Sequence, residues 1–279
     1  MSASTFVVPD LSTQTPADVT VNFDRIETAV AAVIDQARAG RGFCFFTLNL
    51  DHLVNLKTDE RFKRAYRAAD FVSADGWPVV WLLRRQGYLV ERASGADLVE
   101  PLCARAAQCG IGVYLVGPRR ESQERAAAIL RARYPMLEIL GAETPDLPHL
   151  SSDEAIEDLA ERIRASGARL CFLSLGSPKQ EILAAALVRL CPEVGFVGVG
   201  AAIDFISRHA IRAPLFMQRH GLEWLWRAVG DPKRLGLRYL RCSKFFVSVL
   251  WWSLYDRRVF SIVHGAKTLP LGGKDRLTA

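Results

Sequence analysis

The sequence predicts an α/β fold in which a mainly parallel sheet carries helices on both faces, in a Rossmann-like arrangement. Short apolar runs typical of buried parallel strands alternate with segments of helical periodicity. The alternation continues from residue 23 to residue 199, as consecutive βαβ units require. The chain has 279 residues, of which 50% are hydrophobic and 24% charged, so it can bury a large core.

The expected elements follow one another regularly. Residues 1–20 are expected to form a loose polar lead-in, and Phe23–Ala39 a helix, because its apolar residues recur at helical spacing before Gly40. The same spacing predicts helices at Leu50–Ala69, Pro78–Gln86, Leu98–Gln108, Glu121–Tyr134, Glu154–Ala165 and Pro178–Leu190. Short apolar runs predict strands at Phe43–Leu48, Phe71–Val72, Val113–Val116, Glu138–Leu140, Leu170–Leu175 and Val194–Val199.

Charge divides the chain near residue 204. The net charge is +6, yet residues 205–279 hold 14 Lys/Arg against four Asp/Glu and four of the six tryptophans. We therefore expect a catalytic α/β domain at 1–204 and a basic, aromatic, helical appendage at 205–279. Such a charge asymmetry favours an anionic partner for the appendage. Its concentrated tryptophans favour a membrane interface over nucleic acid.

Several classes of protein are disfavoured. The six cysteines form no C-x-x-C pair and are interpreted as small buried hydrophobes in a reducing compartment. Residues 1–20 show no signal-peptide pattern, and the longest apolar run, Phe245–Tyr255, is shorter than the roughly 20 residues of a spanning helix. The histidines lack ligand spacing and no D-x-D pair occurs, so we expect no metal site.

Polar residues follow two of the expected strands, at the sheet edge where ligands bind in open α/β folds. Thr47 and Asn49 follow the run FCFF and could position the hydroxyl groups of a ligand, although the ordinary role of Asn49 there is a helix cap. Asp75 and Gly76 follow the next strand. Asp-Gly commonly forms a turn, but a carboxylate just beyond a buried strand is also a candidate catalytic group.

Two further loops could hold phosphate. The segment from Gly176 to Glu181 opens a helix whose first N–H groups suit an anion, and Lys179 adds charge; a capped helix with an exposed lysine is the alternative. Gly198 and Gly200 match the front of a dinucleotide fingerprint without its third glycine. An NAD-type oxidoreductase is therefore kept as an alternative function, and so is a non-catalytic membrane- or nucleic-acid-binding module.

The order of the motifs resembles the WecG/TagA/CpsF family of bacterial glycosyltransferases over Phe43–Tyr239. The motifs are T-x-N from residue 47, A-D-G-x-P from 74, G-S-P-K-Q-E from 176, G-V-G-x-x-x-D from 198, R-A-P from 212, E-W-x-W-R from 223, D-P-K-R from 231 and R-Y from 238. The chain departs from the family at 117–120, where G-P-R-R replaces a G-G-x-P-G turn, and at Leu237, where an arginine is common.

The resemblance implies inverting transfer of a hexose or N-acetylhexosamine-type sugar from a UDP-sugar to a polyprenyl-diphosphate-linked saccharide. This step would serve cell-surface or exopolysaccharide synthesis on the cytoplasmic face of the plasma membrane, without metal or cofactor. The enzyme would be a peripheral membrane protein, and a homo-oligomer is left open. Phe245, Phe246, Trp251 and Trp252 are expected to insert at the interface, with packing on the protein as the alternative.

The resemblance also implies roles for particular residues. Asp75 would be the general base that an inverting displacement requires, and Thr47 would take part beside it. Without a metal, the leaving diphosphate needs Arg, Lys or backbone N–H groups. Residues expected to bind substrate are Asn49, Arg92, Gln180, Asp204, Arg227, Arg234 and Arg238 from the resemblance, and Gly176 and Lys179 from the helix start.

Overall fold

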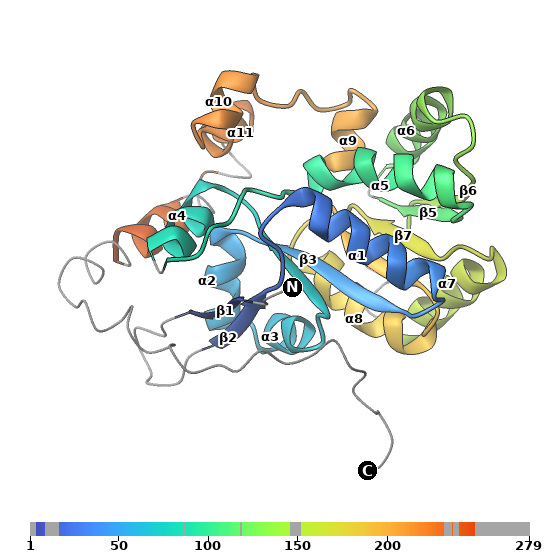
Figure 1. Ribbon diagram of the computed structural model, residues 1–279, viewed down its shortest axis with the longest axis horizontal. Coiled ribbons are helices and arrows are strands. Elements are labelled where there is room, and N and C mark those ends of the chain that lie inside the picture. The colour runs from blue at the N-terminus through green and yellow to red at the C-terminus, as the bar shows by residue number, and fades with distance from the viewer. Residues whose placement is uncertain are drawn as a thin grey trace, which may run out of the picture.

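A six-stranded parallel sheet forms the centre of the computed structural model, which describes residues 4–8, 17–85, 87–117, 119–145, 152–231, 236 and 240–248 (Figure 1). The strand order is β4-β3-β8-β7-β5-β6, and every neighbouring pair is parallel. The strands are β3 (Phe43–Leu48), β4 (Phe71–Ala74), β5 (Val113–Val116), β6 (Ile139–Glu143), β7 (Leu170–Leu173) and β8 (Gly195–Gly198). The predicted fold class is confirmed.

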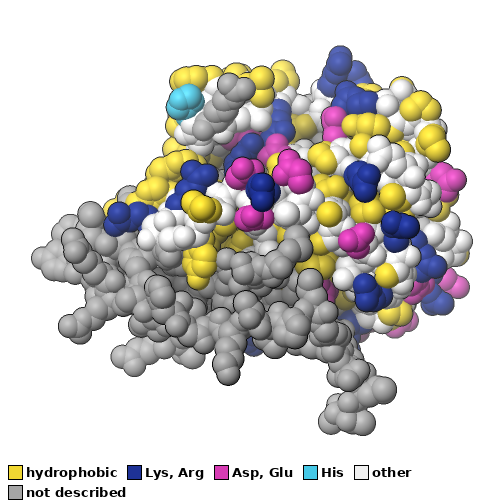
Figure 2. Space-filling model, viewed as in Figure 1, with side chains coloured by type: hydrophobic (Ala, Val, Ile, Leu, Met, Phe, Trp, Pro, Cys, Tyr) yellow, Lys and Arg dark blue, Asp and Glu magenta, His cyan; other side chains and the backbone are white. Residues whose placement is uncertain are grey.

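Helices cover both faces of the sheet, as predicted. One face carries α2 (Leu50–Thr58), α3 (Glu60–Arg67), α4 (Trp77–Arg85), α7 (Asp153–Ala165) and α8 (Lys179–Leu190). The other carries α1 (Ile26–Arg38), α5 (Gly95–Cys109), α6 (Arg120–Arg133) and α9 (Ala202–Ile206), with α1 beside α5 (Figure 1). Next come α10 (Leu215–Arg219) and α11 (Glu223–Gly230), which bear exposed hydrophobic side chains (Figure 2).

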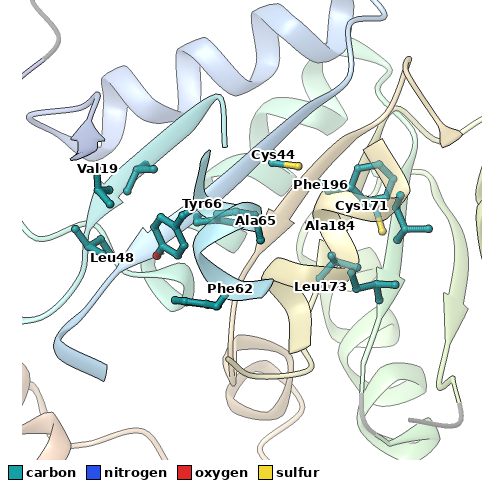
Figure 3. Packing of buried hydrophobic residues seen from close by; sticks show 14 of the residues in the cluster. Val19, Cys44, Leu48, Phe62, Ala65, Tyr66, Cys171, Leu173, Ala184 and Phe196 are labelled. Atoms are coloured by element: carbon teal, nitrogen blue, oxygen red, sulfur yellow. The ribbon is translucent and has the colours of Figure 1, made fainter. Parts of the chain in front are cut away.

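Two hydrophobic layers hold the helices on the sheet. Because side chains alternate along a strand, Phe46 enters one layer and Phe45 the other, and both are fully buried. Figure 3 shows part of the first layer, which includes Phe62 of α3 and in which Ala184 of α8 lies near Phe196 of β8. Burying one such phenylalanine contributes about 1.5–3 kcal/mol, so these layers are the main source of stability.

The predicted helix Leu50–Ala69 is wrong, because it is two helices. Asp59 has extended backbone between α2 and α3, and its side chain accepts hydrogen bonds from the backbone N–H groups of Arg61 (2.9 Å) and Phe62 (3.0 Å). An aspartate in this position caps a new helix, so it ends the continuous helix that the apolar spacing suggested.

The predicted polar lead-in is also wrong. β1 (Ser4–Val8) and β2 (Ala17–Val21) form an antiparallel pair. Val19 and Val21 alternate with polar residues and join the first hydrophobic layer, which is the pattern of a strand with one buried face. Asn22 then pairs with Val72 of β4 through its backbone N–H (2.9 Å) and its side-chain oxygen (2.7 Å), so this segment lies beside the sheet.

The amino end of α5 lies against the carboxyl end of β8. The helix begins at Gly95, three residues earlier than predicted, and the Ser94 hydroxyl accepts the Asp97 N–H at 3.3 Å as a cap. A Cβ atom at Gly95 would lie 2.7 Å from the Val199 Cα, so only glycine allows this approach. The contact fixes the start of α5 at the edge where ligands are expected.

Part of the aromatic tail packs on the sheet domain. In the helical segment 240–248, the ring of Phe245 lies under Lys57 of α2, with Nζ 4.8 Å from the ring centroid. Phe246 contacts Trp77 and Trp81 of α4, with ring centroids 6.0 and 5.9 Å apart. The alternative interpretation, packing on the protein, therefore applies to Phe245 and Phe246, which are half-buried by these contacts. Trp251 and Trp252 lie outside the described residues.

None of the helices in the described ranges combines the length and the apolar composition that crossing a membrane requires.

We expect Gly95→Ala to lower the free energy of unfolding by about 1–3 kcal/mol, because its methyl group would meet the backbone of Val199. Gly230→Ala is the matched control, since a Cβ atom added at this position in α11 would have no neighbouring atom within 4 Å. The control should be at least as stable as wild type in urea unfolding, because alanine favours a helix over glycine. Equal stability of both variants would contradict the proposed close approach.

Candidate active site

The predicted site residues follow the carboxyl ends of the strands. From β3 and β7 the chain passes into α2 and α8, which pack in the first hydrophobic layer, whereas from β8 it passes into α9 in the second layer. β8 lies between β3 and β7, so neighbouring strands send the chain to opposite faces. In open α/β sheets, a crevice for ligands forms at such a point.

Thr47 and Asn49 lie at the end of β3. Thr47 is buried within the strand and is paired in register with Ser73 of β4. The Asn49 side chain accepts the backbone N–H of His52 at 3.1 Å, which confirms the helix-cap interpretation. Both residues therefore lie at the candidate edge, but the Asn49 oxygen is used to begin α2.

Asp75 directly follows β4, and its backbone N–H donates to the Leu48 carbonyl at 2.7 Å. The side chain is half-buried, and burial raises the pKa of its carboxyl to about 6, while Arg92 and Arg227 oppose the rise and Glu223 adds to it. A carboxyl with this pKa exchanges its proton near neutral pH, as a general base must. Among the carboxylates in the described part of the chain, Asp75 therefore fits the base best.

Arg92 is held next to Asp75 by hydrogen bonds between the adjacent Ala93 and the end of β4. The neighbouring Ala93 N–H donates to the Ala74 carbonyl at 2.8 Å, and the Ser73 hydroxyl donates to the Ala93 carbonyl at 2.8 Å. The connection between α4 and α5 therefore runs along the end of β4. This placement explains why Arg92 is the strongest of the charges that lower the pKa of Asp75.

Four charged side chains form a closed ring beside Asp75, which we call the ion-pair ring. Arg92 lies 3.0 Å from Asp97 and 3.3 Å from Glu223. Arg212 lies 2.5 Å from Asp97 and 3.8 Å from Glu223. The four side chains are between 17% and 26% exposed, so the charges alternate in a largely buried setting.

The ion-pair ring stabilises the ionised form of Asp97. Burial by itself would raise the pKa of Asp97, but Arg92, the Ser94 hydroxyl and Arg212 together hold it below the usual range. Asp97 belongs to the first turn of α5, while Arg212 and Glu223 follow residue 204. The ring therefore joins the sheet edge to the segment that the charge pattern assigned to the appendage.

Arg227 reaches the same site from α11. Its guanidinium lies over the ring of Phe205, 5.2 Å from the centroid, and it lowers the pKa of Asp75. This places Arg227 near the candidate base, and its implied role in substrate binding stays a prediction. Arg234 and Arg238 lie outside the described residues, so their roles stay predictions.

The loops after β7 and β8 are tied together by Gln180. Its buried side chain accepts the Gly200 N–H at 3.1 Å and donates to Glu181 at 2.8 Å. The amide of Gln180 thus braces the edge of the crevice. Gly176 turns the chain with a φ of +74°, and Lys179 begins α8 with an exposed side chain, as the alternative interpretation of this segment expected.

Two polar atoms on these loops are enclosed. Ser177 Oγ and Asp204 Oδ1 are buried and make no hydrogen bond within the part of the chain that the structure describes. Buried polar atoms in this state are rare in folded proteins and are a reason to expect a ligand or water nearby. Asp204, in α9, thus keeps its place among the candidate binding residues.

A buried polar layer lies beneath the site. The Tyr66 hydroxyl and His52 Nδ1 are 2.6 Å apart, and His52 Nε2 lies 3.8 Å from Glu181. Burial raises the pKa of Tyr66 well above its usual value, and the carboxylates of Glu181 and Asp75 raise it further. Tyr66 therefore stays neutral below Asp75.

Several residues of the site were not predicted from the sequence. Arg212 and Glu223 fall within the R-A-P and E-W-x-W-R motifs, yet the motifs by themselves indicated no role for either. The signal for Asp97 was the S-x-x-D pattern that caps α5. His52 and Tyr66 had no sequence signal, because their pairing depends on how α2 packs on α3.

The described residues contain no group of three or more His, Cys, Asp or Glu side chains placed to hold a metal ion. A pocket of about 370 Å³ lies at the opposite edge of the sheet, between the ends of α1 and α5 and next to Arg169. It is therefore remote from the residues above.

The model of a family described as glycosyl transferase WecG/TagA/CpsF matches residues 17–259. This range includes the whole parallel sheet, the ion-pair ring and α11.

We expect Asp75→Asn to stabilise the protein at high pH. An unfolded aspartate has a pKa of about 3.9, whereas that of folded Asp75 is about 6, so the stability that the protonated form provides is lost as pH rises through 6. The stability of the variant relative to wild type should increase by about 2–3 kcal/mol between pH 4 and pH 8 in urea unfolding. A difference that does not change with pH would contradict the raised pKa.

Proposed function

Since the chain belongs to the WecG/TagA/CpsF family of glycosyltransferases, we propose that it moves a hexose or N-acetylhexosamine-type sugar from a UDP-sugar to a polyprenyl-diphosphate-linked saccharide. The observation that carries this proposal is the setting of Asp75. Its half-buried carboxyl has a pKa of about 6 at the ligand-binding edge, where Arg92 and Arg227 both act to lower that pKa. This arrangement suits transfer that needs both a base and positive charge.

In the proposed reaction, the acceptor hydroxyl attacks the anomeric carbon from the side opposite the UDP group. Asp75 takes the hydroxyl proton as the new C–O bond forms, and the bond to the diphosphate oxygen breaks so that UDP leaves with the electron pair. At pH 7 Asp75 is mostly ionised, yet it is a stronger base than an ordinary surface carboxylate. The single displacement inverts the anomeric centre.

Positive side chains would stabilise the leaving diphosphate. Arg92 and Arg227 act on Asp75 and therefore lie near the reacting atoms, and Lys179 lies at the start of α8. Arg234 and Arg238 are proposed to add charge from the segment after α11. With these groups the reaction needs no metal ion, because positive charge is brought to the diphosphate by the chain itself.

The NAD-type alternative is less consistent with the geometry. A dinucleotide fingerprint uses backbone N–H groups at the start of a helix to bind pyrophosphate. Here the Gly200 N–H donates to Gln180, and α9 contains only five residues. A non-catalytic binding module does not explain the raised pKa of Asp75.

We further propose that an apolar surface after α9 docks on the anionic inner face of the plasma membrane, where a lipid-linked acceptor would lie. Its exposed residues, which we call the apolar cap, are Ile211, Leu215, Phe216, Trp224 and Val229, with exposures from 42% to 78%. Figure 2 shows hydrophobic side chains at the top of the view, where Figure 1 places α10 and α11. The basic composition of residues 205–279 would add attraction to anionic lipids.

A donor screen tests the reaction. Purified protein is incubated with a panel of UDP-sugars and a short polyprenyl-diphosphate-linked sugar, with EDTA present, and products are detected by mass spectrometry. We expect one donor to give product, and Asp75→Asn to lower turnover by roughly 10²–10⁴-fold while UDP binding persists. Near-normal turnover of Asp75→Asn would remove it from the base role, and activity that only Mg²⁺ or Mn²⁺ restores would overturn the metal-free mechanism.

Sedimentation with anionic vesicles tests the apolar cap. We expect the double variant Leu215→Ser, Phe216→Ser to bind at least about 10-fold more weakly, because each exposed side chain loses about 1.5–3 kcal/mol of burial. Met136→Ser removes a side chain that is 74% exposed between α6 and β6, and it should bind like wild type. Unchanged binding of the double variant would reject the apolar cap as the docking surface.

A further inference from the structure

We propose that Glu223 is a positioning residue for sugar transfer, because it fixes Arg92 and Arg227 beside the base Asp75 through the ion-pair ring. The inference rests on the proposed function of Asp75. Glu223 itself is not placed against the reacting atoms, and it acts through the arginines that it holds.

The two carboxylate oxygens of Glu223 face different arginines. Oε2 lies 3.3 Å from Arg92 Nη1, and Oε1 lies 3.8 Å from Arg212 Nε. Asp97 completes the ring with contacts of 3.0 Å to Arg92 and 2.5 Å to Arg212. Without Glu223, each arginine would keep a single acidic neighbour in the ring and could turn away from its present position.

Glu223 also sets the position of Arg227. It is the first residue of α11, and Arg227 lies four residues later, so both project from the same side of the helix. The ring contacts at Glu223 anchor the start of this helix to the sheet edge. Arg227 is then held toward Asp75, whose pKa it lowers. The carboxylate of Glu223 thus positions both Arg227 of α11 and Arg92, which lies in the connection before α5.

The charges around Asp75 are balanced by this arrangement. The charged groups that shift the pKa of Asp75 are Arg92 before α5, Asp97 in α5, and Glu223 and Arg227 in α11. Asp75 in turn raises the pKa of Tyr66 in α3. Two arginines alone would hold the base ionised and weaken it. Because the ring contains as many acids as arginines, it places Arg92 near the reaction without a net positive charge at that position.

The test compares the pH dependence of kcat and kcat/KM for Glu223→Gln, Glu223→Asp and wild type. Glu223→Gln removes the negative charge that raises the pKa of Asp75, so the acidic limb of the pH–rate profile should move to lower pH by about 0.5–1 unit. The value of kcat at pH 7.5 should fall roughly 10-fold, because the arginines are no longer held in place. Glu223→Asp keeps the charge on a shorter side chain. Its acidic limb should match wild type, and its kcat should lie between those of wild type and Glu223→Gln.

Glu193→Gln serves as the matched control. Glu193 pairs with Arg164 at 3.8 Å, is 34% exposed, and precedes β8 at the opposite edge of the sheet. It should leave both the pH profile and kcat unchanged.

Glu223→Gln with a wild-type acidic limb and kcat would overturn the inference, as would lower thermal stability with an unchanged limb. If Glu223→Gln does not fold, Glu223→Asp by itself tests the inference. A reduced kcat of Glu223→Asp with an unshifted acidic limb supports the positioning role, whereas a wild-type kcat overturns it. Asp75→Asn separates the two proposals. An active Asp75→Asn rejects the base itself, whereas an inactive Asp75→Asn with normal kinetics in Glu223→Gln rejects only the role of Glu223.

Discussion

The ion pairs among Arg92, Asp97, Arg212 and Glu223 are the interaction on which the candidate site depends. They join the start of α5 to a segment more than one hundred residues later in the chain, with Arg92 and Glu223 separated by 131 positions. Removing one side chain from a largely buried ring leaves an uncompensated buried charge, so all four side chains are needed for the ring to be stable. Through it, the C-terminal segment becomes a wall of the site, and Arg227 is brought to Asp75.

The site combines loops held by hydrogen bonds with a carboxyl group, that of Asp75, whose burial disfavours its ionised form. Asp75 is pinned by its N–H to the end of β3, and the loops of β7 and β8 are braced by Gln180. Burial of Asp75 raises its pKa and therefore makes its ionised form costly at neutral pH. A protein that keeps such a group for catalysis gives up some stability at that position.

The segment after residue 204 serves more than one structural purpose. Phe245 and Phe246 pack on α2 and α4, so part of the aromatic tail belongs to the folded body. Ile211, Leu215 and Phe216 instead remain exposed around α10. Composition could not separate these two groups, because an aromatic residue suits both a protein core and a membrane interface.

The parallel sheet and the candidate base could be predicted from the amino-acid sequence. Strands buried on both faces must be continuously apolar, which is why runs such as that of Phe43–Leu48 were recognised, and Asp75 stood out because it directly follows one. The contacts of the polar side chains, in contrast, became known from the folded structure. The cap at Asp59, the amide of Gln180 on Gly200 and the partners of Glu223 were not predicted from local pattern. Apolar periodicity reports which face of an element is buried, whereas hydrogen bonds and ion pairs depend on which distant segments the fold brings together.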